Sequence, residues 1–162
     1  MTSVVEREGL ARGLSVPPNS AEAEESVLGS VLMSADAANL ALEKLHAEDF
    51  YRPAHQSIFQ SISELFDGNQ PIDAVTVSEA LRRSGALDRV GGVGYLTQLI
   101  DAVPTASNIE YYADIVEEHA LRRRLLRTGG DISSLATTMD DPIGQVLDRA
   151  EQAVFAVSER RI

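Results

Sequence analysis

The stretch IGQVLDRAEQAVFAV, residues 143–157, carries apolar side chains at a helical spacing. Counted from its first residue, the apolar positions 0, 3, 4, 7, 10, 11 and 14 form two heptads of a seam. Such a seam needs a partner, because burial of apolar surface away from water is favourable. The seam consists of Ile143, Val146, Leu147, Ala150, Ala153, Val154 and Val157. Asp141 and Pro142 precede it and are typical of a helix start.

A second long helix is predicted directly upstream of this stretch. Ser107-Asn108-Ile109-Glu110 has the spacing of a capping box, and the helix is expected to run to about Thr128. Gly129-Gly130 is a predicted weak point, since each glycine in a helix costs about 1 kcal/mol relative to alanine. Two long helices joined by a short polar turn make a helical hairpin, which we place at 105–158.

The apolar stripes of this hairpin predict self-association. Within the sequence nothing follows the second helix that would cover its outer face. An exposed apolar stripe of this size indicates a contact with another chain. The candidate oligomer interface, which would give a dimer, consists of Ile109, Tyr112, Val116, Ile143, Val146, Leu147, Ala150, Val154 and Val157.

Upstream of the hairpin, a series of shorter helices is expected. Pro17-Pro18 ends a leader, and Ser20 is placed to cap a helix with acidic residues in its first turns. Pro53 opens a strongly amphipathic helix, which Gly68 would end as a left-handed cap. Further predicted features are a helix over Ala37–Leu45, a capping box at Thr76–Glu79 with Gly85 closing its helix, a loop at Gly91–Gly94, and a helix from Tyr95 to Val103.

No segment alternates apolar and polar residues convincingly enough to predict a strand, so the fold class is all-α. The expected architecture is a globular helical bundle followed by a projecting antiparallel helical hairpin. We expect a flexible leader over 1–16, the bundle over 17–104, the hairpin over 105–158, and the start of a linker over 159–162.

The charge of the chain speaks against autonomous DNA binding. It has 14 basic and 25 acidic residues, a net charge of −11. Domains that grip phosphates usually carry excess Lys and Arg. There is no cysteine, which is compatible with a reducing cytoplasm, and neither a signal peptide nor a run of apolar residues long enough to cross a bilayer. We expect a cytoplasmic protein without membrane contact.

Catalytic, cofactor-binding and metal-binding residues are all predicted to be absent. His46, His55 and His119 lack the spacing of a metal site, and a structural role is expected for each; His55 should hydrogen-bond the neighbouring loop. The adjacent carboxylates of Glu24-Glu25 and of Glu117-Glu118 point about 100° apart on a helix, so they do not share a site. No phosphate-binding loop occurs in the sequence.

Two features remain open between a structural and a functional interpretation. The cluster Arg122, Arg123, Arg124 and Arg127 fits a solvated helix end, a contact with acidic residues of another subunit, or a phosphate contact. Tyr95, Leu126 and Ile132 fit either the core or a partner surface. Two further classes of function compete with an assembly module: a DNA-binding regulator that uses Thr76–Arg89, and an enzyme of unknown reaction.

Several segments, in this order, resemble the N-terminal domain of the DnaB family of replicative helicases, over about 17–158. They are Pro17–Gly29, Asp49-Phe50-Tyr51, His55, Ile58-Phe59, Pro71-Ile72-Asp73, Gly85, Leu87, Val90-Gly91-Gly92, Tyr95-Leu96, Pro104-Thr105, Asn108, Tyr111-Tyr112-Ala113, Ile115 and Arg122–Leu125.

The resemblance implies a role in assembly and partner contact. Family members continue into a RecA-like ATPase domain, to which ATP, Mg²⁺ and strand unwinding belong, whereas this chain stops at Ile162. The domain is expected to form a collar on a hexameric ring, with dimer contacts through the hairpin, and to dock the C-terminal domain of primase. Its candidate anchors for primase are Tyr95, Leu126 and Ile132. A helicase loader is a further implied partner, and single-stranded DNA is one only for the full-length ring.

Overall fold

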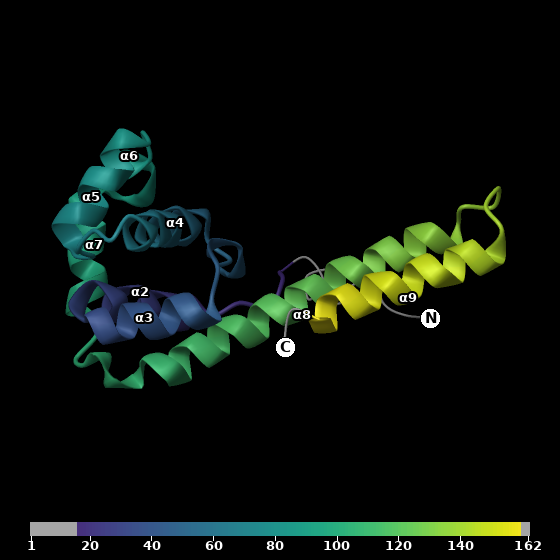
Figure 1. Ribbon diagram of the computed structural model, residues 1–162, viewed down its shortest axis with the longest axis horizontal. Helices are drawn as coiled ribbons and strands as arrows, with labels where there is room; N and C mark the ends of the chain where they lie inside the picture. The colour runs from purple at the N-terminus through teal and green to yellow at the C-terminus, as the bar shows by residue number, and fades with distance from the viewer. Residues whose placement is uncertain (1–15, 160–162) are drawn as a thin grey trace, which may run out of the picture. The chain divides into compact units, whose positions relative to one another are not determined.

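The computed structural model describes residues 16–159, except for the side chain of Ser107. All regular elements in this range are helices (Figure 1). The all-α prediction is confirmed. Most of the expected leader and the last three residues of the expected linker lie outside the described residues. The helices are α2 (Ala21–Met33), α3 (Ala35–Lys44), η1 (Ala47–Asp49), α4 (Pro53–Asp67), α5 (Ala74–Arg83), α6 (Leu87–Val90), α7 (Gly92–Asp101), η2 (Ala106–Asn108), α8 (Ile109–Ala136) and α9 (Ile143–Glu159).

The chain divides into two compact units, and the division falls inside α8. One unit is Asn19–Ala120, the bundle; the other contains the chain from Leu121 onward together with the segment that ends at Pro18. The sequence instead predicted the boundary at 104/105. The difference arises because the first turns of α8 belong to the bundle: Ile109, Ala113 and Val116 are part of its hydrophobic core.

The core of the bundle lies where α2 meets α3, α4 and α7. Its largest members are fully buried, and the rings of Phe50 and Phe59 pack with centroids 4.9 Å apart. The amphipathic pattern predicted after Pro53 is confirmed for Ile58, Phe59 and Ile62, which lie in this core, and for Leu65, which packs against it, whereas Phe66 is 44% exposed. The other large core residues are Leu28, Leu45, Ile58, Ile62, Leu81, Leu96 and Leu99.

Gly29 allows α2 and α7 to approach closely. A Cβ atom at this position would lie 2.2 Å from the carbonyl oxygen of Leu99 and 2.6 Å from Cγ2 of Val103. The first of these is a backbone atom and cannot swing aside. The helix pair therefore requires a residue without a side chain at position 29.

We predict that Gly29→Ala destabilises the bundle by about 1–3 kcal/mol, the usual cost of overpacking a core. Gly94→Ala is the matched control, because Gly94 lies in α7, has no positive φ, and a Cβ atom added to it would meet nothing within 4 Å. It should be neutral or stabilising by up to about 1 kcal/mol. Chemical denaturation measures both changes. Equal stability of the two variants would contradict the close helix contact.

Several helix ends differ from the prediction by a few residues. Helix α5 is capped by Asp73 rather than Thr76: the Asp73 carboxylate accepts the Thr76 N–H at 2.9 Å, and the Thr76 hydroxyl accepts the Asp73 N–H at 3.0 Å. Thr76 is therefore the third residue of the helix, because Asp73 offers the stronger cap. At the end of α4 the left-handed residue is Asn69, with φ 55°, and not Gly68.

Other helix ends agree with the prediction or shift it slightly. Ser20 caps α2 by accepting the N–H of Ala23 at 3.1 Å, and Pro53 is the first residue of α4. The loop predicted at Gly91–Gly94 is confined to Gly91, which has a φ of 109°, and α7 already begins at Gly92. Short α6 had no counterpart among the predicted elements.

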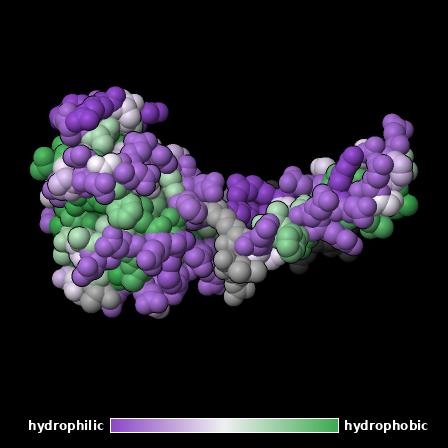
Figure 2. Space-filling model, viewed as in Figure 1, coloured by the Kyte–Doolittle hydropathy of each residue, from purple (hydrophilic) through white to green (hydrophobic). Residues whose placement is uncertain are grey.

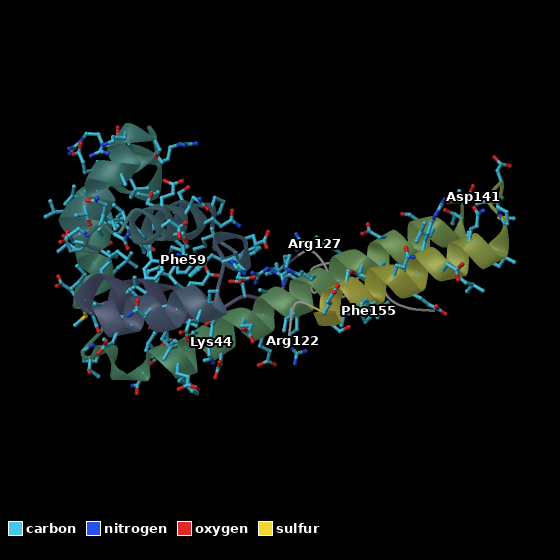
Figure 3. The ribbon with its side chains drawn as sticks, in the orientation of Figure 1. Lys44, Phe59, Arg122, Arg127, Asp141 and Phe155 are labelled. Atoms are coloured by element: carbon cyan, nitrogen blue, oxygen red, sulfur yellow. The ribbon has the colours of Figure 1, made fainter. Side chains whose placement is uncertain are left out.

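Lys44, the only lysine of the chain, joins α3 to the first turns of α8. Its ammonium group forms an ion pair with Asp114 and lies 3.8 Å from the carboxylate of Glu110 (Lys44 is labelled in Figure 3). The hydrogen bond to Asp114 raises the pKa of Lys44, and the neighbouring carboxylates add to this, against the opposing effect of burial.

The second unit contains an antiparallel helical hairpin, in which α9 runs beside the second half of α8 (Figure 1). Gly129-Gly130 does not break α8, which continues to Ala136; the paired helix provides packing that outweighs the low helix propensity of glycine. Helix α9 begins at Ile143, one residue later than predicted, and the Asp141 carboxylate accepts a hydrogen bond from Arg149 at 3.1 Å.

Candidate partner-binding surfaces

Three polar side chains from three helices of the bundle form a buried chain of hydrogen bonds. Glu24 of α2 and His55 of α4 are 2% and 0% exposed. His55 Nδ1 lies 2.7 Å from Glu24 Oε1, and His55 Nε2 lies 2.5 Å from the hydroxyl of Tyr95 in α7. A carboxylate only accepts, so Nδ1 carries the proton of the first bond; in the neutral imidazole Nε2 then accepts the O–H of Tyr95.

Glu24 also holds the segment that leads into α4. Its Oε2 accepts the backbone N–H of Tyr51 at 2.7 Å, and its Oε1 accepts that of Arg52 at 3.4 Å. These backbone groups lie just before Pro53, the first residue of α4. One buried carboxylate thus connects α2, the 51–52 segment and, through His55, α4 and α7. We call this set the Glu24 network.

Tyr95 lies at the edge of this network and is partly exposed. Burial raises the pKa of its phenol, and the Glu25 carboxylate raises it further; the charge of Arg52 and a hydrogen bond from its side chain act in the opposite direction. The phenol therefore remains a hydrogen-bond donor at neutral pH. Its accessible side forms part of a pocket of about 440 Å³, which is also lined by Glu25, Gln98, Leu99, Asp101 and Ala102.

In the hairpin unit, Leu126 lies on a second open pocket. Leu125 and Leu126 of α8 are both exposed, and they line a volume of about 630 Å³ together with Val16, Pro18, Arg122 and Gly129. Its wall is stabilised by Arg123, whose guanidinium donates to the carbonyl oxygen of Pro18 at 2.7 Å. Patches of apolar surface interrupt the hydrophilic surface of this unit in Figure 2.

The seam of α9 is divided into a covered and an open row. Val146 is buried, and Ala150, Ala153 and Val157 are partly buried, so these residues face α8. Successive residues of a helix are about 100° apart, which places Ile143, Leu147 and Val154 in a row about 40° wide beside the first. This second row is exposed. We call it the outer row of α9.

Comparison with known proteins decides the family. The profile described as the DnaB-like helicase N terminal domain matches residues 16–118. The chain belongs to this family. Replicative DNA helicase DnaB of Geobacillus stearothermophilus is 47% identical over 146 residues, which is 90% of this chain and 32% of the relative. Replicative DNA helicase DnaB of Mycobacterium leprae is 45% identical over 148 residues, 90% of this chain and 24% of the relative. The chain thus spans about a third or less of these helicases.

Solved structures agree with this assignment to the DnaB family. The N-terminal domain of DnaB helicase from Mycobacterium tuberculosis superimposes with a TM-score of 0.83 at 44% identity, covering 87% of this chain and 99% of that one. A DnaB-like replicative helicase, whose structure was described together with its interactions with primase, has a TM-score of 0.69 at 24% identity and shares the fold; 85% of this chain and 31% of that one are covered. The matched domain is the non-catalytic N-terminal part of these helicases.

Part of the predicted oligomer interface is already used within the chain. Ile109 and Val116 are buried in the core of the bundle, and Tyr112 packs against it. Val146 is likewise covered inside the hairpin unit. The buried residues Ile109, Val116 and Val146 are therefore not available to another chain, whereas the partly buried Tyr112, Ala150 and Val157 stay in the candidate interface. The most exposed part of the candidate interface is the outer row of α9. Phe155, which was not predicted, is 64% exposed but lies about 100° from Val154 around the helix, outside this row (Figure 3).

The predicted partner anchors fall in both units. Tyr95 belongs to the bundle, whereas Leu126 and Ile132 belong to the hairpin unit, where Leu126 is exposed and Ile132 partly buried. Tyr95 combines the two interpretations given for it, since its hydroxyl bonds the buried His55 while its side chain is partly exposed. The prediction that His55 bonds the neighbouring loop was wrong, because its partners come from α2 and α7.

Glu24 had no predicted role beyond its place in a capped helix. One signal was present: Glu24 precedes Leu28 by four residues and Val31 by seven, so it lies on the apolar face of its helix. A carboxylate on such a face requires buried hydrogen-bond partners. Among the described residues, no group of His, Asp and Glu is arranged to hold a metal ion, and no helix is long and apolar enough to span a membrane.

We predict that the free energy of unfolding falls as the pH rises above about 10. The pKa values of Tyr95 and Lys44 are raised in the folded state above their ordinary values of 10.0 and 10.5. A raised pKa means that the folded state holds its proton more tightly than the unfolded state, so stability present below the unfolded pKa is lost at higher pH. Denaturation at a series of alkaline pH values measures the slope. Tyr95→Phe should make it shallower, whereas Tyr111→Phe, at an exposed tyrosine, should not. An unchanged slope in Tyr95→Phe would contradict the assignment.

Proposed function

We propose that this domain forms the N-terminal collar of a hexameric replicative DNA helicase, where it joins neighbouring subunits and docks primase during DNA replication in the cytoplasm. The observation that carries the proposal is the exposed outer row of α9, on a domain that belongs to the DnaB family. An assembly domain needs such a surface, whereas a self-contained monomer would leave it uncovered at a cost in solvation free energy.

The outer row supports dimerisation through the hairpin. Ile143, Leu147 and Val154 are exposed and lie four and seven residues apart on one side of the helix, which is an arrangement that a second helix of the same kind can cover. A contact between two copies of the same row would be self-complementary, as a twofold dimer requires. Pairs formed in this way are the units from which we expect the hexameric ring to be built.

We predict that Leu147→Asp combined with Val154→Asp converts the associating domain into a monomer. Both side chains are exposed, so the charges should be tolerated in the folded hairpin but not in a helix–helix contact. Light scattering over a range of concentrations measures the mass. Val75→Asp is the control, because this equally apolar residue is 78% exposed in the bundle. A wild-type domain that stays monomeric at high concentration would refute the dimer.

Primase docking is supported by two accessible apolar sites next to charged groups. The pocket beside Tyr95 is flanked by Glu25 and Asp101, and the pocket at Leu126 by Arg122. Apolar anchors with a charged rim are typical of protein interfaces. The net charge of −11 would increase the rate of association with a basic partner at low salt. The primase interactions described for one relative concern that protein and motivate the choice of partner.

We predict that Leu126→Ala weakens binding to the C-terminal domain of primase about tenfold, as expected for an interface anchor that contributes about 1–2 kcal/mol. The effect should lie mainly in the dissociation rate, because the charges that steer association are unchanged. Surface plasmon resonance measures both rates. Val75→Ala serves as the control for loss of an exposed apolar side chain elsewhere. If Leu126→Ala binds as tightly as wild type, the pocket at Leu126 is not a primase contact.

The remaining functions of the helicase are assigned to parts outside this chain. The sequence has no phosphate-binding loop, so we attribute ATP, Mg²⁺ and strand unwinding to a C-terminal ATPase domain. Contact with single-stranded DNA is proposed only for the assembled full-length ring. A helicase loader is a further proposed partner, for which no surface of this domain is singled out.

A further inference from the structure

We propose that His55 and Glu24 are positioning residues for Tyr95, and that they hold its ring in one orientation before a protein partner binds. The inference rests on the proposed function, in which Tyr95 contacts primase. It adds two buried residues that the partner does not touch but on which its affinity depends.

The contact between His55 and Tyr95 restricts the ring of Tyr95 at two points. The hydroxyl is held at 2.5 Å from His55 Nε2, and the two rings are nearly parallel, with an interplanar angle of 6° and centroids 5.9 Å apart. A tyrosine side chain has two rotatable bonds that determine where its ring lies. The oxygen lies on the axis of the Cβ–Cγ bond, so its hydrogen bond restrains the rotation about Cα–Cβ. The parallel packing against the His55 ring restrains the rotation about Cβ–Cγ, while the accessible side of the ring remains open to the adjoining pocket.

The other side of His55 is held rigidly. Glu24 binds Nδ1 at 2.7 Å and is itself held by the backbone N–H groups of Tyr51 and Arg52. Both side chains are almost fully buried, and the ring of Phe50 packs edge-on against His55 with centroids 6.5 Å apart. An imidazole that is fully buried and hydrogen-bonded at both ring nitrogens cannot rotate without breaking these bonds. The orientation of Tyr95 is thus fixed by the core rather than by the surface.

Such a restraint affects binding because a free side chain loses conformational freedom when it enters an interface. Ordering one rotamer-rich side chain usually lowers affinity about threefold to tenfold. A tyrosine that is ordered beforehand avoids this loss. Removing the bond to His55 should therefore weaken partner binding by that factor, even though the contact area of the ring is unchanged.

Two substitutions of His55 separate positioning from stability. In His55→Asn the amide reaches the place of Nδ1 and retains the bond to Glu24, but the bond to Tyr95 is lost. In His55→Gln the longer side chain reaches the place of Nε2 and retains the bond to Tyr95, while the bond to Glu24 is lost. Both variants lose one of two buried hydrogen bonds, so their melting temperatures should fall by similar amounts.

Binding to the C-terminal domain of primase is then measured well below both melting temperatures. We expect His55→Asn to bind about threefold to tenfold more weakly than wild type, and His55→Gln to bind more tightly than His55→Asn. Tyr95→Phe, which keeps the ring but removes the hydroxyl, should match His55→Asn. In the Tyr95→Phe background the two His55 variants should bind alike, because there is no hydroxyl left to hold. Tyr111→Phe is the control at an exposed tyrosine.

The possible results distinguish this inference from the function on which it rests. If wild type does not bind the primase domain, the proposed docking function is refuted, and this inference with it. If wild type binds, and Tyr95→Phe or His55→Asn binds equally well, docking stands and the positioning role is refuted. It is also refuted if the affinities of the His55 variants follow their melting temperatures alone. In either of these two cases, the His55 variants in the Tyr95→Phe background cannot restore the positioning role.

Discussion

The bundle depends on one buried carboxylate. Glu24 brings together α2, the segment before α4 and, through His55, α4 and α7. A buried ionisable group is favourable only when its hydrogen-bonding positions are used, and leaving such a group without its partner typically costs about 1–3 kcal/mol, more when the group is charged. This requirement makes the arrangement specific, because slipping any of these helices would leave a polar group without a partner. Gly29 also makes the helix arrangement specific, because its lack of a side chain allows α7 to lie directly on α2 in the apolar core.

Under the proposed docking function, the same network links stability to recognition. Tyr95 is the point at which the buried chain of hydrogen bonds reaches the accessible surface. Its ring has one side bonded to the core and another side open to solvent. A surface group that is supported by the core in this way can be more ordered than its exposure suggests, which is the property that a docking anchor needs.

In the hairpin unit, the two rows of the α9 seam differ in their surroundings. The row that contains Val146 is covered within the chain, whereas the row of Ile143, Leu147 and Val154 is exposed, and it is this row that the proposed dimer would use. The two rows are adjacent on the helix, so the heptad pattern of the sequence contains both. An apolar stripe that is wider than one partner helix can cover is a reason to expect a second partner.

Much of this fold follows from the sequence alone. The period of the apolar residues identifies the helices, and Ser20 and Pro53 mark two helix starts correctly. Helix ends are less certain because neighbouring residues compete as caps: Asp73 displaced Thr76, and Asn69 took the place expected for Gly68. These are local choices whose energies differ by about 1 kcal/mol or less, so the surrounding packing decides them.

The sequence by itself determined the class of fold, the hairpin and the family, because each depends on the order and period of residue types. Only the tertiary structure decided which apolar residues are covered and which polar residues meet. Ile109 and Val116 lie on the same helical stripe as residues further along α8, and only their packing in the bundle shows that they are unavailable to a partner. Glu24 and His55 are 31 residues apart along the chain, and His55 and Tyr95 are 40 residues apart. No local pattern encodes a hydrogen bond over such a separation. The chain of hydrogen bonds is formed by the packing of three helices, and it exists only once they are assembled.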